Sequence, residues 1–342
     1  MMKRIIFLLA CFMKIVFCKA GGYVVKSTDS SFIDGQYVFL LDGVKWNVLD
    51  SARIENASFR IEGTDKGTGV CFPYMGKSSN SQELTQIGNL VFLEDDACIV
   101  LRSDSMYGRV SEGSPMNDAY WGLMKSRVGK SLEEAKDLTK DVLRRNPNEL
   151  GCYLLEDLMV MASKQEIDSL MRAFPSAMHR HPLYMRAKAM LDEIKADLSM
   201  PYMDVSGKDA GGQTLALSGT VSRKGVKYVL LEFWATWCGP CRREVPNLKR
   251  MYASYREKGF EIYGMSFDTD VKRWKKVLEQ EALPWTNVIT EVKDNPRNTS
   301  VWKAYGVNGI PWNYLIDAAS GRIIGKCLRG EDLSDKLAEL MP

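Results

Sequence analysis

An apolar run that leads directly into two closely spaced cysteines constrains the fold of this chain more than any other stretch. Residues 228–235, Tyr-Val-Leu-Leu-Glu-Phe-Trp-Ala, form the largely apolar run expected of a strand that is buried on both faces. After the cysteines, apolar residues recur at helical spacing: Val245, Leu248, Tyr252 and Tyr255. We therefore predict a strand that turns into a helix at Cys238 and Cys241.

The two cysteines lie at the start of this predicted helix. Pro240 suits a first helical turn, where a missing N–H costs nothing. Cys238 is expected where free backbone amides and the positive end of the helix dipole favour a thiolate. Cys241 follows about one turn later, close enough to close a small disulfide ring. This placement indicates a redox-active pair.

A zinc site and a purely structural disulfide are the other uses of such a pair. Zinc needs two further ligands, but the chain has no second Cys-x-x-Cys and only two histidines, His179 and His181. Histidines two apart on a predicted loop are commonly surface residues. A two-residue disulfide ring would keep its sulfurs near the surface. We therefore expect no metal and favour the redox interpretation.

The first twenty residues have the pattern of an export signal. Lys3-Arg4 precede a short apolar run, and a small residue, Ala20, ends the segment. The run is too short and too interrupted to span a bilayer comfortably. Residues 8–11, Leu-Leu-Ala-Cys, also resemble a lipoprotein box in which Cys11 would carry a lipid anchor, although cleavage after Ala20 competes with it. We expect a periplasmic or cell-envelope location.

The charge balance gives no sign of a nucleic-acid partner. Without the four basic residues of the predicted signal, 42 of the 46 Lys and Arg residues remain, against 43 Asp and Glu. A chain so close to neutrality implies no basic surface for nucleic acid.

Six cysteines remain beyond the predicted signal: Cys71, Cys98, Cys152, Cys238, Cys241 and Cys327. An oxidising compartment would allow Cys71 and Cys98 to form a bridge, because both lie in one β-rich region. Free buried cysteines are common core residues, however. We expect Cys152 in a helix and Cys327 in a strand to serve packing.

Changes in the pattern of apolar, polar and turn-forming residues along the chain predict four segments: a signal peptide 1–20, a β-rich domain 21–113, a helical region 114–198 and an α/β domain 199–342. In the β-rich domain, short apolar runs separated by Gly, Asp, Asn and Ser turns favour a small antiparallel sandwich or barrel. The runs are 37–41, 58–62, 90–93 and 98–101. We see no catalytic pattern there, so packing, dimerisation and substrate docking are the open roles.

The helical region is predicted from its start and stop signals. Ser131 and Ser163 each precede a glutamate three residues later, the pattern of a capping box. Prolines at 147, 175 and 182 mark breaks, so we expect three or four helices. The methionine-rich stretch 158–161 is interpreted as core packing.

The last segment alternates between strand and helix patterns. Strands are expected near 215, at 228–235, 260–267, near 288, at 312–317 and at 322–328, and helices at 240–258, 270–282, 299–305 and 332–341. This order predicts a mixed sheet with helices on both faces.

Two motifs in this segment resemble those of a known family. Residues 232–241, which end in Trp-Cys-Gly-Pro-Cys, resemble the active-site segment of thioredoxin-fold proteins, and Val-Asn-Gly-Ile-Pro at 307–311 resembles the family's cis-proline loop. The insertion around 268–284 and the Glu-Val-Pro at 244–246 look like the TlpA/ResA-type envelope branch. More weakly, residues 21–198 resemble the N-terminal region of unknown function that precedes such domains in some bacterial envelope proteins.

The resemblance implies a role for each matching residue. Cys238 would be the exposed nucleophile and Cys241 the cysteine that resolves the mixed disulfide. Glu232 would be the buried acid that exchanges protons with Cys241, rather than a solvated strand-edge residue. Glu244 matches an acid of the TlpA/ResA-type branch, but it could equally be a solvated residue of the helix surface.

The resemblance also implies a substrate-binding rim. Trp237, Gly239 and Pro240 would border the cysteines. Ile310 and Pro311 would cover the sulfurs and offer backbone groups to an extended substrate, which also keeps metals out. One departure follows the proline, where Trp312 replaces the smaller polar residues of the family and puts substrate preference in doubt.

These features predict a thiol-disulfide oxidoreductase of the cell envelope that acts on protein disulfides or dithiols and requires no cofactor. Gly-Pro between the cysteines matches thioredoxin and so favours a reductase, which would need a membrane electron donor. One alternative is a binding or docking module with an incidental redox domain. Another is a thiol peroxidase, although Thr236 stands only two residues before Cys238 and no matching arginine is evident.

Overall fold

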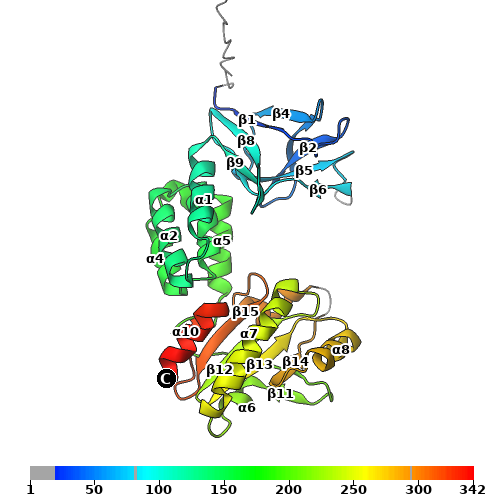
Figure 1. Cartoon of the computed structure of the whole chain (residues 1–342). Coiled ribbons are helices and arrows are strands. Elements are labelled where there is room, and N and C mark those ends of the chain that lie inside the picture. The colour runs from blue at the N-terminus through cyan, green and yellow to red at the C-terminus, as the bar shows by residue number, and fades with distance from the viewer. Residues whose placement is uncertain (1–19, 81–82, 293–294) are drawn as a thin grey trace, which may run out of the picture. The chain divides into compact units, whose positions relative to one another are not determined.

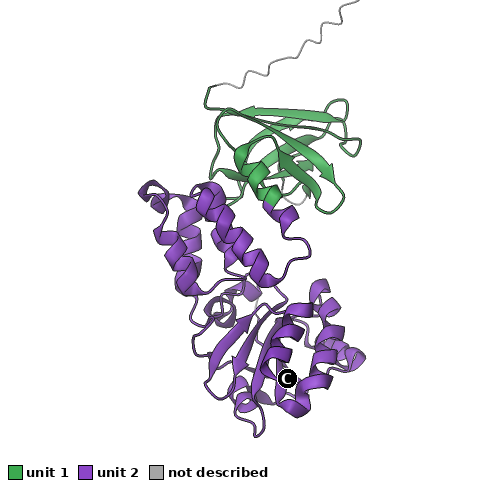
Figure 2. Cartoon of the chain, turned by 60° about the vertical axis from the view of Figure 1, so that its left-hand side comes forward, with its two compact units in different colours: residues 1–122 green, residues 123–342 purple. Residues whose placement is uncertain are grey.

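The computed structural model describes residues 20–80, 83–292 and 295–342 (Figure 1). Apart from Ala20, the expected export signal and its Cys11 and Cys18 lie outside these residues. The chain divides into two compact units between Gly122 and Leu123 (Figure 2). No helix in the described residues is long and apolar enough to cross a membrane. The four segments expected from the sequence stay predictions.

The first unit contains two β-sheets among its described residues. One has the strand order β4-β1-β8-β9 and the other β3-β2-β5-β6, with β7 paired to β5. The first sheet comprises β4 (Ser58–Gly63), β1 (Tyr23–Thr28), β8 (Ala97–Asp104) and β9 (Gly108–Glu112). The second comprises β3 (Val48–Arg53), β2 (Tyr37–Asp42), β5 (Val70–Gly76), β6 (Thr85–Gln86) and β7 (Val91–Phe92).

The two sheets share one core, which confirms the sandwich-like prediction. Val25 and Ile99 from the first sheet pack with Val38 and Leu40 from the second. The expectation of purely antiparallel pairing is wrong, because β1 and β8 are parallel. These strands are far apart in the sequence, so no local turn signal marks how they pair.

Cys71 and Cys98 do not form the bridge that the sequence allowed. Both are free cysteines, Cys71 buried and Cys98 partly buried. They lie on strands of different sheets, β5 and β8. Cys71 packs in the shared core, as a buried apolar residue does.

The region 115–198, which is fully described, contains five α-helices rather than three or four. They are α1 (Pro115–Ser126), α2 (Leu132–Arg145), α3 (Glu149–Leu158), α4 (Lys164–Arg172) and α5 (Pro182–Glu193), with a 3₁₀ helix at Ser176–Arg180. Helix α1 crosses the boundary between the two units. The helix count was too low because the first helix has no capping box to mark its start.

The predicted helix starts and stops are confirmed. Ser131 and Ser163 both form complete capping boxes, at the starts of α2 and α4. The break at Pro147 separates α2 from α3, and Pro182 is the first residue of α5. Met159 and Met161 are buried, as their interpretation as core residues requires.

The second unit also holds a seven-stranded sheet in the order β11-β10-β14-β13-β12-β15-β16 (Figure 1). Strand β12 lies inside the sheet, next to the central strand β13, parallel to β13 and antiparallel to β15. The strands are β10 (Ser206–Lys208), β11 (Thr214–Ala216), β12 (Tyr228–Trp234), β13 (Phe260–Ser266), β14 (Thr286–Ile289), β15 (Trp312–Asp317) and β16 (Arg322–Lys326).

Helices cover both faces of this sheet, because side chains alternate along each strand. On one face Leu230 and Ile262 pack with Leu248 of α7 and Leu333 of α10, and on the other Leu231 and Tyr263 pack with Leu217 of α6 and Trp302 of α9. The helices of this part are α6 (Leu217–Val221), α7 (Gly239–Tyr255), α8 (Val271–Glu281), α9 (Ser300–Ala304) and α10 (Gly330–Leu340). The predicted mixed sheet with helices on both faces is confirmed.

One strand ends earlier than expected, and this matters for the site. β16 ends at Lys326, so Cys327 is not a strand residue. Cys327 has a φ of 52°, in the left-handed region, and its N–H donates to the carbonyl of Asn313 (2.9 Å). The chain turns there toward α10, which begins at Gly330 instead of residue 332.

Candidate active site

The two cysteines occupy the junction between β12 and α7. Cys238 is the N-cap of α7, and Pro240 lies in its first turn. Cys238 and Cys241 form a disulfide with their Cα atoms 5.3 Å apart. The backbone N–H of Cys241 also donates to Sγ of Cys238 (3.1 Å). A thiolate on Cys238 would therefore receive an amide hydrogen and the field of the helix N-terminus, both of which stabilise negative charge.

The cis-proline loop covers the sulfurs. The Ile310–Pro311 peptide bond is cis, in agreement with the expectation from the resemblance. Sγ of Cys238 lies 3.4 Å from the carbonyl oxygen of Ile310. Pro311 itself is buried. The loop thus lies against the cysteine pair, as expected.

The expected exposure of Cys238 is wrong for this oxidised form. Cys238 is 4% exposed and Cys241 is 3% exposed, because the disulfide holds the Cys238 sulfur against the cis-proline loop. The exposed residues of the segment are its neighbours: Trp237 is 53% exposed, and Gly239 and Pro240 are also exposed.

Glu232 lies beneath the disulfide. It is 3% exposed, and its Oε2 accepts a hydrogen bond from Nδ2 of Asn313 (2.9 Å). Glu232 and Cys241 line the same small internal cavity, whose volume of about 10 Å³ approaches that of one water molecule. The carboxyl group and the cysteine therefore border the same small space inside the protein.

Burial makes this carboxyl group a weak acid. Desolvation raises the pKa of Glu232 to about 8, and the negative charge of Glu244 adds to the rise. The Asn313 hydrogen bond and the positive charge of Arg329 act in the opposite direction. A group with this pKa can both hold and release a proton near neutral pH, which is what a general acid-base requires.

Residues 198–324 match the family model described as "AhpC/TSA family". A protein of Bacillus thuringiensis subsp. konkukian called "Thiol-disulfide oxidoreductase ResA" is 33% identical over 115 residues, 34% of this chain and 62% of that protein. The protein of the same name from Oceanobacillus iheyensis is 55% identical over 90 residues, 26% of this chain and 44% of that protein. Residues 198–324 are thus similar to these ResA proteins over about a third of this chain. This chain therefore spans less than two thirds of the relatives' length.

A solved structure is similar to the same part of the chain. It is the thioredoxin domain of a thiol-disulfide oxidoreductase from Bacteroides vulgatus, with 32% identity and a TM-score of 0.38. The match covers 42% of this chain and 98% of that domain.

Two residues that the sequence analysis missed, Asn313 and Arg329, hold the site together. Asn313 lies opposite Glu232 in the β12–β15 ladder, and its amide also bonds both backbone groups of Leu328 (2.8 and 2.9 Å). Arg329 donates from its guanidinium to the carbonyl of Pro311. Asn313 was detectable as the one polar residue inside the run 312–316. Arg329 carried no local signal, because the chain reaches the site only by the turn after β16.

Glu244 is neither fully solvated nor in contact with the cysteines. It is partly buried, and its Oε1 accepts hydrogen bonds from the N–H of Gly330 (3.0 Å) and from Nδ2 of Asn247 (2.6 Å). Gly330 is the first residue of α10, so Glu244 fixes the start of that helix. Its charge nevertheless reaches Glu232.

Trp312 does not face the substrate rim. It is 2% exposed and belongs to the sheet core, paired in the ladder with Phe233. Its size therefore serves packing in the core of the seven-stranded sheet. The position of Trp312 does not support the expectation that this residue alters substrate preference.

The described residues contain no group of three or more His, Cys, Asp or Glu side chains that could hold a metal ion. The two histidines have other contacts in the helical region. His181 caps α5 by accepting the N–H of Leu183 (3.3 Å), and His179 stacks on Tyr184.

Proposed function

We propose that this protein is a thiol-disulfide oxidoreductase that reduces disulfide bonds in other proteins. The observation that carries the proposal is a disulfide at a helix N-terminus whose Cys241 lines the same small cavity as Glu232, a buried acid with a pKa of about 8. The similarity to proteins called ResA supports it.

The proposed reaction begins with the reduced cysteine pair. The Cys238 thiolate attacks one sulfur of a client disulfide, so a Cys238–client bond forms while the client S–S bond breaks. The displaced client sulfur leaves as a thiolate and takes a proton from solvent. The client approaches along Trp237, Gly239 and Pro240, and its backbone pairs beside Ile310 and Pro311.

Cys241 then completes the exchange. Glu232 takes the Cys241 proton through the shared cavity, and the resulting thiolate attacks Sγ of Cys238. The mixed disulfide breaks, the Cys238–Cys241 disulfide forms, and the client leaves with its second thiol. The client gains two electrons and two protons, which a donor must return to the pair before the next cycle.

Three of the other cysteines, Cys71, Cys152 and Cys327, do not compete for this chemistry. Burial raises the pKa of Cys152 to about 12 and that of Cys327 to about 11, and it places the pKa of Cys71 well above the ordinary value. These thiols stay protonated at neutral pH and are poor nucleophiles.

The finer features of the proposal concern location. We infer export by residues 1–20, work in the periplasm or cell envelope, and a membrane-bound electron donor. Lipidation at Cys11 would keep the domain near such a donor. Intact mass of the envelope-purified protein distinguishes a lipid on Cys11 from cleavage after Ala20.

A thiol peroxidase is not favoured. Such chemistry needs a threonine hydroxyl turned toward the reactive sulfur, but Thr236 gives both its N–H (2.9 Å) and its hydroxyl (2.6 Å) to the carboxylate of Asp268. Hydrogen peroxide consumption in the presence of a reductant would contradict this interpretation. A docking module with an incidental redox domain would leave the buried acid without a purpose.

Trapping tests the proposal directly. Cys241→Ser should stall mixed disulfides on Cys238, visible as client adducts that a reductant releases, and the adducts identify the clients. Cys238→Ser and Cys327→Ser are the matched controls, neither of which should trap. If Cys241→Ser captures nothing, the exchange proposal fails. Equilibration of the Cys238–Cys241 pair with glutathione measures its reduction potential and so decides whether the protein reduces or oxidises its clients. A potential near that of the strong oxidant DsbA would show an oxidase.

A further inference from the structure

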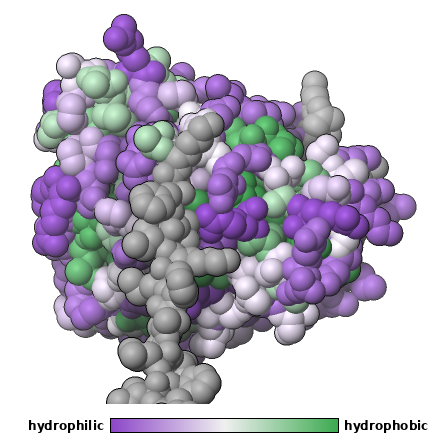
Figure 3. Space-filling view, turned by 90° about the horizontal axis from the view of Figure 1, so that it is seen from above, coloured by the Kyte–Doolittle hydropathy of each residue, from purple (hydrophilic) through white to green (hydrophobic). Residues whose placement is uncertain are grey.

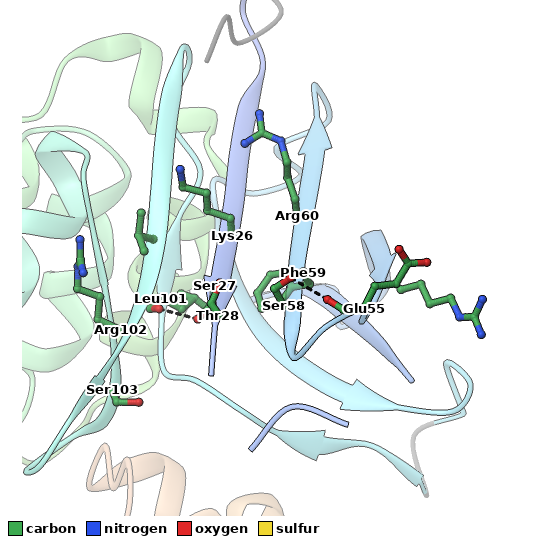
Figure 4. A pocket seen from close by; sticks show the side chains of 12 residues that line it. Lys26, Ser27, Thr28, Glu55, Ser58, Phe59, Arg60, Leu101, Arg102 and Ser103 are labelled. Carbon is green, nitrogen blue, oxygen red and sulfur yellow. Dashed lines mark hydrogen bonds between the residues drawn. The ribbon is translucent and has the colours of Figure 1, made fainter. Parts of the chain in front are cut away.

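A basic groove crosses the outer face of the first sheet in the N-terminal unit. Its volume is about 890 Å³, and its lining includes four cations, Lys26, Arg53, Arg60 and Arg102, with a single acid, Glu55. Figure 4 shows Lys26, Arg60 and Arg102 on three neighbouring strands, while Glu55 lies apart from them beyond β4. This concentration of one sign of charge is at odds with the near-neutral composition of the whole chain.

Two of these cations face each other directly. Lys26 of β1 is in register with Arg60 of the antiparallel strand β4. Like charges at directly opposed positions of a ladder destabilise a sheet. No described residue forms an ion pair or hydrogen bond with the Lys26 ammonium group. An anion that lies between the two side chains would therefore offset a repulsion that the Arg60–Glu62 pair relieves only on the Arg60 side.

Two arginines of the groove form ion pairs that a ligand could replace. Arg60 pairs with Glu62 (2.5 Å) and Arg102 with Glu112 (3.0 Å), and every one of these four side chains is more than a third exposed. Exposed ion pairs contribute little to stability, so exchanging one carboxylate for another costs little.

The three serine hydroxyl groups of the groove lining are already bonded within the protein. The Ser27 hydroxyl donates to the carbonyl of Leu101 (2.7 Å), that of Ser58 to the carbonyl of Glu55 (2.8 Å), and that of Ser103 to Asp29 (2.6 Å). The first two bonds are the dashed lines of Figure 4. A ligand therefore meets mainly guanidinium and ammonium groups, three of the four being arginines that suit carboxylates.

We propose that this groove binds an acidic, extended segment of a partner polypeptide. Carboxylates on one side of an extended chain recur about 7 Å apart, similar to the roughly 5–8 Å between opposed and diagonal positions of neighbouring strands, such as Lys26 with Arg60 and Lys26 with Arg102. Recognition of acidic motifs by clustered arginines is a common mode of peptide binding. The proposal is independent of the exchange chemistry proposed for the other unit.

An anionic membrane surface fits the groove less well. Membrane-binding faces combine basic residues with exposed apolar side chains that enter the lipid. The large exposed apolar residues of this unit, among them Ile33, Trp46, Val48 and Met106, are not part of the groove lining. In the face shown in Figure 3, hydrophilic residues predominate and hydrophobic ones form small separate groups, outside the part that grey atoms cover.

The experiment uses the full chain and a labelled peptide of about twelve alternating Glu and Ser residues, with binding followed by fluorescence anisotropy at low salt. Lys26→Thr/Arg60→Thr removes the opposed pair, and Lys45→Thr/Lys77→Thr removes two exposed lysines of the same unit outside the groove, so both variants lose the same charge. We expect the first variant to weaken binding about tenfold or more and the second less than about twofold.

A stability measurement separates binding from folding. Removing the opposed pair relieves repulsion, and threonine suits a strand, so the melting temperature of Lys26→Thr/Arg60→Thr should stay the same or rise. Equal loss of binding in the two variants would show a general charge effect and overturn the proposal. So would failure of the wild-type chain to bind the peptide, whether or not it binds phosphatidylglycerol vesicles.

Discussion

Glu232 is the residue on which the proposed chemistry depends most after the cysteines. With a pKa of about 8, it is mostly protonated at neutral pH, so its capacity to accept the Cys241 proton grows as the pH rises through 8. We expect the rate of mixed-disulfide resolution to rise over that range. Glu232→Gln should lower the rate about 100-fold and remove the inflection, as measured by stopped-flow kinetics.

Glu244→Gln is the matched control for this prediction. It removes a charge that raises the pKa of Glu232, while the amide oxygen can still accept the N–H of Gly330. The inflection should move to lower pH with little change in the limiting rate. An unchanged profile in Glu232→Gln would mean that another group takes the proton.

Substitution of Arg329 is expected to shift the pH inflection in the opposite direction. Its positive charge lowers the pKa of Glu232, and its guanidinium holds the carbonyl of Pro311. Arg329→Met should move the pH inflection upward and weaken client binding, seen as a higher KM. Arg329→Lys keeps the charge without the planar fork, so the inflection should stay while KM rises. If both variants shift the inflection equally, the charge of Arg329 is not what lowers the pKa of Glu232.

The roles of residues that belong to a local sequence motif could be predicted, whereas the roles of residues that meet the site only through the tertiary fold could not. The spacing of the cysteines and Pro240 predicted their role, and the position of Glu232 in an apolar run predicted its burial. The burial of Cys238 could not be foreseen, because it depends on a loop more than 70 residues away, at Ile310. Arg329 was missed for the same reason.

Among the secondary-structure elements, those with chemical start and stop signals were predicted well. The capping boxes of α2 and α4 and the proline breaks are local, so their helices were located from the sequence. The parallel pairing of β1 with β8 and the early end of β16 depend on distant partners. The predicted number of helices was too low because α1 lacks such a signal.

A buried ion pair gives the prediction that belongs to the elements. Nζ of Lys326, at the end of β16, lies 2.7 Å from Oδ1 of Asp197, and both side chains are at most 2% exposed. The other oxygen of Asp197 accepts the N–H of Lys164, the first residue of α4 (2.5 Å). Lys326→Met should therefore lower the free energy of unfolding by about 3–5 kcal/mol, because it leaves a buried carboxylate without its cation.

Urea unfolding followed by circular dichroism measures this loss. The matched control is Lys336→Met, which breaks an exposed pair with Glu339 (2.9 Å) and should cost less than about 1 kcal/mol. Similar losses in the two variants would mean that the Lys326–Asp197 pair does not secure α4 to the sheet.

For the whole molecule, the pH dependence of stability follows from Glu232. Its pKa is about 8 in the folded protein but near the ordinary value of 4.5 once the chain unfolds. Between these values the unfolded chain releases a proton that the folded chain keeps, so its ionisation favours unfolding as the pH rises. The stability that the protonated group provides is complete below pH 4.5 and is lost by about pH 8, a change of about 5 kcal/mol as an upper limit.

Comparison with Glu232→Gln isolates this effect from every other titrating group. The variant keeps the hydrogen bond from Asn313 but cannot ionise, so its unfolding free energy should decline less from pH 4.5 to pH 8. The wild-type and variant curves, measured by urea titration of the oxidised proteins, should diverge steadily over that window. Parallel curves would mean that Glu232 ionises as easily in the folded chain as in water, and the buried acid could not then serve as the proton carrier of the site.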